Sequence, residues 1–217
     1  MKKIIAAVVA VITGLFVATN YPGGVTPTST RVDLVDGAVT FTAETSGDDR
    51  LLVAVVLHDH PDCSLASATY DGTALTLIGR GALGTETVDI AALLAPSTGS
   101  NDAAVSMSEG VEGEVLYIRL ENVSQDALPG KPYIAVGNSD FSIDAVEGDA
   151  VLCILLSRPS STSTSIGGSF TRLQDPDIGG TDTRIQVYLA EDGMSGAAEV
   201  TTGAADTIAL LIGLDNV

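Results

Sequence analysis

The sequence predicts an all-β protein, an antiparallel β-sandwich preceded by an apolar N-terminal helical segment. Apolar residues make up 45% of the chain but aromatic residues only 4%, so the core must be built from Val, Leu, Ile and Ala. Short β-rich runs alternate with turn clusters, and no stretch of the body sustains helical periodicity. The 217 residues are enough for a sizeable core.

The first segment, residues 1–19, has two lysines followed by an apolar run over residues 4–18. It has the form of a secretory signal, with a basic start and an apolar stretch short for a membrane span. Three readings remain open: a cleaved signal, an uncleaved membrane anchor, and a tether embedded in a partner protein. If the segment is retained, its attachment positions recur at helical spacing; they are Ile4, Val8, Val11, Ile12 and Leu15.

Residues 20–30 combine Pro, Gly, Thr and Ser, a composition typical of an extended linker. The globular body is therefore expected over residues 31–217, as a single sandwich. Strands are predicted at 31–35, 38–44, 50–58, 65–70, 74–79, 86–94, 102–107, 114–121, 132–136, 140–146, 150–157, 169–173, 183–190, 197–201 and 206–213.

Hydrophobic patterning separates two kinds of strand. The stretches LLVAVVL, VLCILL and IALLIGL are apolar throughout, as expected of strands covered on both faces. Residues 39–44 instead alternate apolar and polar side chains, which indicates a strand with one wet face. Turn signals such as Asp36-Gly37 and Asp71-Gly72 separate the runs.

A search for internal similarity finds three pairs of stretches in the same order. GDDRLLVAVVL resembles GDAVLCILLS, TETVDIAALL resembles TDTRIQVYLA, and YIRLENV resembles LIGLDNV. The body is therefore expected to consist of two similar halves. Because neither half is long enough to hide both faces of its own sheet, we expect the halves to interleave into one sandwich.

The order RLLVAVV, SATYDGTALTLIG, a strand ending in LLAP, EVLYIRLENV and GDAVLCILL resembles a family of single β-sandwich domains. That family occurs in secreted bacterial proteins and in phage structural proteins, with a typical Tyr-Gly-Gly-x-x-Leu-Thr stretch. Here Asp71 departs from this pattern. The resemblance covers roughly residues 40–217 and implies a jelly-roll or concanavalin-like architecture with a role in display or contact.

The charge balance excludes one class of partner. The chain has 28 acidic and 10 basic residues, a formal net charge of −18, and only three lysines, at positions 2, 3 and 131. An acidic surface repels phosphate backbones, so no nucleic-acid binding is expected.

The two cysteines, Cys63 and Cys153, leave two alternatives open. They form one disulfide in an oxidising compartment, or they are two buried thiols. The second is favoured because Cys153 lies inside an apolar run.

Both histidines fall in one short segment, with His58, His60 and Asp62 as candidate metal ligands. On an extended backbone the two imidazoles point to the same side and could hold a transition metal. The competing interpretation, which we favour, is a polar strand end that Pro61 terminates.

The acidic loop over residues 175–182 is read as a solvated hairpin loop in preference to a calcium site. The Ser/Thr run over residues 160–165 is read as a surface loop. The chain has no Gly-x-Ser-x-Gly elbow, phosphate-binding loop or dinucleotide fingerprint. We therefore predict a protein that is not an enzyme and carries no cofactor.

These features lead to two functional expectations. The first is a structural protein on the surface of a virus particle, such as a phage capsid decoration or fibre module, which contacts protein partners through self-association or a capsid protein. The alternative is a secreted or cell-envelope adhesion domain that binds other proteins or a glycan. Membrane contact, in either case, would be made through residues 4–18.

Overall fold

The computed structural model of the protein describes residues 26–137, 139–144, 146–158, 164–168, 170–174, 184–190, 194, 196–203 and 206–215. All regular secondary structure in these residues is β-strand, and the strands pair antiparallel, which confirms the all-β prediction. None of the described residues forms a helix long and apolar enough to span a membrane. The predicted N-terminal helical segment and its attachment positions lie outside the described residues.

The first half of the chain forms two sheets. The larger has the order β1-β9-β3-β7-β6 and the smaller the order β2-β8-β4-β5. The strands are β1 (Thr26–Leu34), β2 (Ala38–Thr45), β3 (Leu51–His58), β4 (Leu65–Tyr70), β5 (Thr73–Ala74), β6 (Thr76–Leu83), β7 (Glu86–Leu94), β8 (Gly99–Met107) and β9 (Gly113–Glu121).

The second half repeats this plan. Its larger sheet has the order β10-β17-β12-β15-β14 and its smaller sheet the order β11-β16-β13. The strands are β10 (Tyr133–Gly137), β11 (Phe141–Ile143), β12 (Ala150–Arg158), β13 (Ser165–Ile166), β14 (Thr171–Gln174), β15 (Arg184–Ala190), β16 (Ala198–Thr201) and β17 (Asp206–Leu214).

The two halves have the same topology strand for strand. Replacing β1, β9, β3, β7 and β6 by β10, β17, β12, β15 and β14 converts one large sheet into the other, and β2-β8-β4 likewise becomes β11-β16-β13. The three similar pairs of stretches in the sequence lie on equivalent strands, namely β3 and β12, β7 and β15, and β9 and β17. The chain is therefore an internal duplication of one two-sheet unit.

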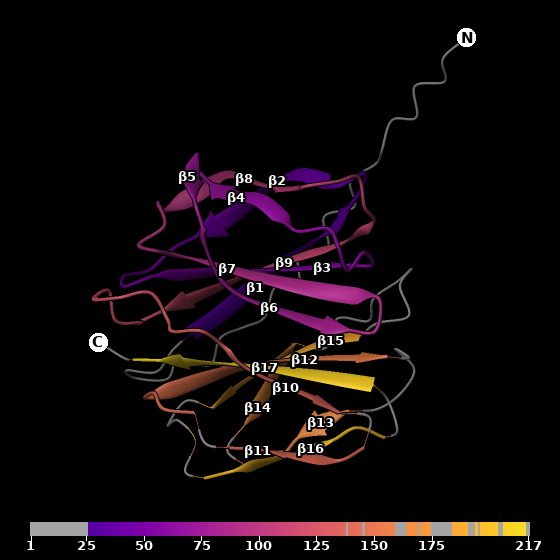
Figure 1. Ribbon diagram of the computed structural model, residues 1–217. Coiled ribbons are helices and arrows are strands. Elements are labelled where there is room, and N and C mark those ends of the chain that lie inside the picture. Colours follow the sequence, from indigo (N-terminus) through magenta and orange to yellow (C-terminus); the bar gives the residue numbers. More distant parts are fainter. Residues whose placement is uncertain are drawn as a thin grey trace.

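The halves stack and do not interleave, in contrast to our expectation. Each half covers one face of its large sheet with its own small sheet, and the two large sheets cover each other (Figure 1). The expectation was wrong because each half hides its second face against the other half. The result is four layers of sheet with three apolar cores between them.

The central core lies between the two large sheets and draws equally on both halves. From the first half it includes Leu57, Ile90 and Leu116, and from the second half Ile154 and Leu210. Because β3, β12 and β17 lie in the two middle layers, both of their faces are buried. The sequence runs that are apolar throughout are thus explained by their position in the stack.

The alternating strand β2 belongs to an outer layer. Phe41 and Ala43 point into the core between the outer and inner sheets, and Thr40 and Thr42 are exposed. Phe41 meets Tyr117 of β9 edge to face, with ring centroids 5.1 Å apart.

Two predicted hairpin turns are present. Asp36 and Gly37 have φ of 53° and 72°, and the Ala38 amide donates to the Val35 carbonyl at 3.2 Å. Asp71 and Gly72, between β4 and β5, have φ of 49° and 72°. Aspartate tolerates the left-handed region and glycine enters it freely, which is why this dipeptide closes tight hairpins.

The start of the body differs from the prediction. The expected linker over residues 20–30 ends earlier, because Thr26 to Leu34 form β1 and pair with Glu121 to Gly113 of β9. Pro27 is compatible with this strand because β1 is at the edge of its sheet. The sequence prediction therefore missed the first part of this edge strand, because its content of Pro, Thr and Ser is typical of a linker.

Candidate functional site

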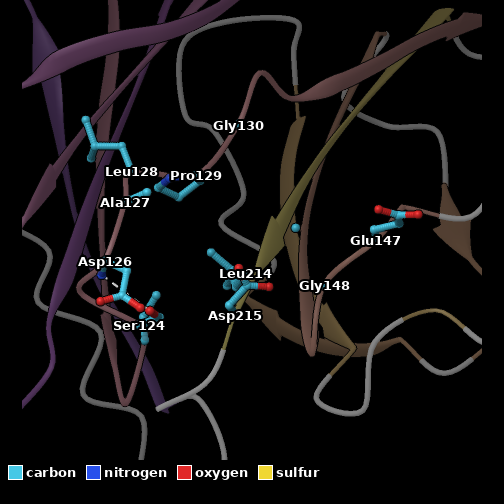
Figure 2. Close-up of a pocket in the computed structure, with 12 residues that line it drawn as sticks. Ser124, Asp126, Ala127, Leu128, Pro129, Gly130, Glu147, Gly148, Leu214 and Asp215 are labelled. Atoms are coloured by element: carbon cyan, nitrogen blue, oxygen red, sulfur yellow. Dashed lines mark hydrogen bonds between the residues drawn. The ribbon is translucent and has the colours of Figure 1, made fainter.

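A hollow of about 490 Å³ lies where the two halves join. One wall is the connection between the halves, residues 123–130, and the other is formed by Glu147 and Gly148 before β12 and by residues 213–215 at the end of β17. Figure 2 shows Ser124 and Asp126 on one side, Glu147 on the other, and Leu214 and Asp215 between them. The Ser124 amide donates to the Asp215 carbonyl at 2.7 Å and ties the two walls together.

The hollow is acidic and open to solvent. Asp126, Glu147 and Asp215 are all exposed, and among the described residues no ion pair involves them. In the part of the chain that the structure describes, no group of three His, Cys, Asp or Glu side chains is arranged to hold a metal ion. Its lining also includes the apolar residues Val123, Leu128 and Leu214, so the recess combines carboxylates that attract cations with apolar side chains.

The predicted metal ligands are separated by the fold. His58 is the last residue of β3 and its side chain is fully enclosed, whereas His60 and Asp62 are exposed. Strand β3 ends at His58, so the alternation that would place both imidazoles on one side does not continue. The arrangement corresponds to the competing interpretation, a polar strand end.

His58 instead faces an aspartate that we did not single out from the sequence. Its Nε2 lies 3.4 Å from Oδ2 of Asp89 in β7, which also accepts a hydrogen bond from the Leu65 amide at 3.0 Å. The Arg80 Nε lies 3.8 Å from Asp89 Oδ1. An acidic residue in the otherwise apolar stretch VDIAALL was the available signal.

This His58–Asp89 cluster is enclosed and serves the packing of strands. The two side chains are 0% and 1% exposed, so no substrate reaches them in this conformation. His58 Nδ1, Thr87 Oγ1 and Asp89 Oδ1 have no hydrogen-bond partner among the described residues. Asp89 holds the first residue of β4 through the Leu65 amide and thereby ties the small sheet to the large one.

The second half has a neutral counterpart of this cluster. Leu57 pairs with Val88, and Leu156 pairs with Ile185, so Ser157 and Gln186 occupy the places of His58 and Asp89. The Thr164 hydroxyl, just before β13, hydrogen-bonds both Ser157 and Gln186. Both halves thus tie the small sheet to the large one through a buried polar side chain.

A second set of charged groups lies on the side of the first large sheet that faces the other half. Arg31 of β1 donates to both carboxylate oxygens of Glu114 in β9, with Nε to Oε2 at 3.1 Å. Burial raises the pKa of Glu114 above its usual value. The hydrogen bonds and positive charge of Arg31 lower the pKa, but by less, so the net shift is upward. Asp33 and Glu86 also repel its negative charge and raise the pKa.

Both cysteines are free and buried. Cys63 belongs to the core between the first pair of sheets and Cys153 to the core between the second pair. The two large sheets separate these cores, so the alternative of one disulfide is excluded and that of two buried thiols is confirmed. Burial also raises the pKa of the Cys153 thiol.

The structure describes only part of the two remaining segments singled out from the sequence, the acidic loop and the Ser/Thr run. The acidic loop over residues 175–182 lies outside the described residues, as do residues 160–163 of the Ser/Thr run. Of the last two residues of the run, Ser165 is exposed, whereas Thr164 is buried and its hydroxyl contacts Gln186, contrary to a surface position.

Comparison with known proteins adds no family name. No protein-family model matches the chain. Nothing matches it among curated proteins or solved structures. The resemblance to sandwich domains of secreted and phage proteins therefore stays a prediction, and the chain is defined here by its duplicated, four-layer all-β fold.

Proposed function

We propose that this protein is a non-catalytic structural module that is displayed on a surface, in the first instance that of a virus particle, and makes contacts there. The apolar N-terminal segment is its attachment. The body holds a rigid, acidic contact surface away from the attachment point.

The observation that carries this proposal is the central core between the halves. It joins two copies of one unit into a block in which every residue of β3 and β12 but Arg158 is buried. Deep apolar burial on this scale resists deformation. The buried charged groups of the described residues are used within the block, in the Arg31–Glu114, His58–Asp89 and Arg158–Glu86 pairs, which suits a role in support and contact better than one in chemistry.

The attachment can be tested with Val8→Asp and Ile12→Asp in the full chain. A charge in the apolar run opposes burial in lipid or in a protein socket, so we expect both variants to be lost from the particle or envelope fraction while the body stays folded. Thr42→Asp, at an exposed position of β2, is the matched control. Recovery of the Val8→Asp protein at normal occupancy would show that the body itself carries the attachment.

The alternative function, adhesion to a glycan or a protein on a cell surface, would use the hollow between the halves. Its exposed carboxylates are acceptors for sugar hydroxyls. The residues that line it include no aromatic side chain on which a sugar ring stacks, and for this reason we rank adhesion to a glycan second. The N-terminal residue of the mature protein separates the two functions, since a new terminus between residues 19 and 26 indicates export.

A further inference from the structure

The hollow at the junction occupies the place of a missing piece of strand. In the first half, β1 pairs with β9 as far as Glu121, so that Thr26 to Ser29 lie opposite Glu121 to Ile118. In the second half, β10 begins only at Tyr133 and pairs with β17 from Leu211 to Thr207. Among the described residues, no strand lies beside Ile212 to Leu214 on this edge.

The connection between the halves explains the gap. The positions equivalent to Thr26–Ser29 are Pro129, Gly130, Lys131 and Pro132. Proline has no amide hydrogen to donate to a neighbouring strand. Pro132 also packs against Gly79 of β6, where the proline ring fills the place of a Cβ, and this contact holds the connection beside the other large sheet.

The unpaired end of the β17 edge therefore borders this recess. At the position where the first half has Arg119, the second half has Gly213, and the Glu147 carbonyl lies against it. The recess is lined by Gly213 and by Leu214 and Asp215 (Figure 2). Unpaired strand edges are templates for the addition of another strand.

We propose that this recess is a strand-addition site that receives an extended, lysine- or arginine-bearing segment of a partner protein. The proposal deepens the contact role proposed above and rests on it. Charge complementarity selects the partner, because Asp126, Glu147 and Asp215 surround the recess on a chain with net charge −18. The backbone of the segment pairs with Ile212–Leu214, and its cationic side chains lie against the three carboxylates.

The test uses the full chain and a short acetylated peptide of alternating valine and threonine with lysines, studied by isothermal titration calorimetry at low salt. We compare it with the same peptide carrying glutamates in place of lysines. A third peptide keeps the lysines but has backbone N-methyl groups along one edge. We expect the lysine peptide to bind, and both comparison peptides to bind about tenfold more weakly or not at all, since a hydrogen bond and a charge pair contribute comparable free energies.

Variants locate the site. Pro129→Thr combined with Pro132→Ser restores the residues found at the equivalent places of β1, and should close the recess and abolish binding. Asp126→Asn combined with Asp215→Asn should weaken binding about tenfold, while Asp59→Asn combined with Asp62→Asn, two exposed acids elsewhere, should leave it unchanged. Equal binding by the N-methylated peptide, or by the proline variant, would overturn the proposal.

One further outcome also counts against a partner segment. If the lysine peptide binds only after Lys2→Gln and Lys3→Gln are introduced, the chain's own basic start competes for the recess and is its occupant. Attachment to particles or envelopes is measured separately with Val8→Asp, so a failure of the proposed function and a failure of strand addition are distinguished.

Discussion

Glu86 of β7 and Arg158 of β12 form an ion pair between the two halves, with Oε1 and Nη1 3.5 Å apart. The arginine side chain is 40% exposed and the glutamate 9%. The pair lies at the edge of the central core, in which apolar side chains from both halves meet. Solvent screening makes such a pair weak compared with the apolar contacts beside it.

The apolar core should dominate the association of the halves. Ile154→Ala removes a fully buried side chain at the centre of that core and should lower the free energy of unfolding by about 2 to 5 kcal/mol. Arg158→Met should cost less than about 1 kcal/mol. Urea denaturation measures both, with Val136→Ala at an exposed position as the control, and a larger loss in Arg158→Met than in Ile154→Ala would contradict the argument.

The buried Glu114 should make stability depend on pH in a particular direction. Because burial raises its pKa in the folded state, its contribution to stability is fully present below the unfolded value of about pH 4.3 and is lost as the pH rises through the folded value. Glu114→Gln removes this dependence. We expect the wild-type protein to lose stability relative to Glu114→Gln as the pH rises from about 4 to 7.

When the two proteins are compared at each pH, the contributions of the other carboxyl groups to the pH dependence of stability cancel. Chemical denaturation at a series of pH values provides the measurement. A constant difference between the wild type and Glu114→Gln would mean that Arg31 fully compensates for burial.

Asp89 should be essential for holding the small sheet against the large one in the first half. Asp89→Ala leaves the Leu65 amide and His58 without their acceptor and should cost about 3 to 5 kcal/mol. Since His58 and Asp89 interact directly, His58→Ala combined with Asp89→Ala should cost less than the sum of the single changes by about 0.5 to 3 kcal/mol. Additive losses in this double-mutant cycle would show that the two side chains act independently.

The N-terminal boundary of the fold should lie at Thr26. Removal of residues 1–24 leaves β1 whole and should yield a soluble β protein with a circular dichroism spectrum of folded sheet. Removal of residues 1–31 deletes most of the strand that pairs with β9 and also the Arg31 partner of Glu114, and should reduce stability strongly. If the two truncated proteins were equally stable, β1 would not be part of the folded unit.

Both cysteines should be unreactive in the native protein. Cys63 and Cys153 are each 0% exposed, and burial keeps the Cys153 thiol protonated by raising its pKa. A thiol reagent should therefore label neither residue in the folded protein and both after denaturation without reductant. Detection of an intramolecular disulfide by mass spectrometry would be incompatible with their separate cores.

The sequence by itself determined the strand content, the hairpin turns at Asp36-Gly37 and Asp71-Gly72, and the internal duplication. These are local properties, since hydrophobic patterning and turn chemistry act over a few residues. It also indicated which strands are covered on both faces, because LLVAVVL and VLCILL contain no polar position. The start of β1 at Thr26 was missed for the same local reason, as an edge strand tolerates a composition that is typical of a linker.

Only the tertiary structure decided how the two halves pack together. That packing depends on which faces of the large sheets bury each other, and the hydrophobic pattern of one half does not identify the sheet that covers it. Stacking placed Glu114 and Glu86 beside a second sheet and separated Cys63 from Cys153. Within the first half, β3 ends at His58, whose side chain faces Asp89, while His60 is exposed. Stacking also left the edge of β17 unpaired at Ile212–Leu214. Pro132 packs against Gly79 of the other half, so the connection does not pair with β17 in the way that the start of β1 pairs with β9.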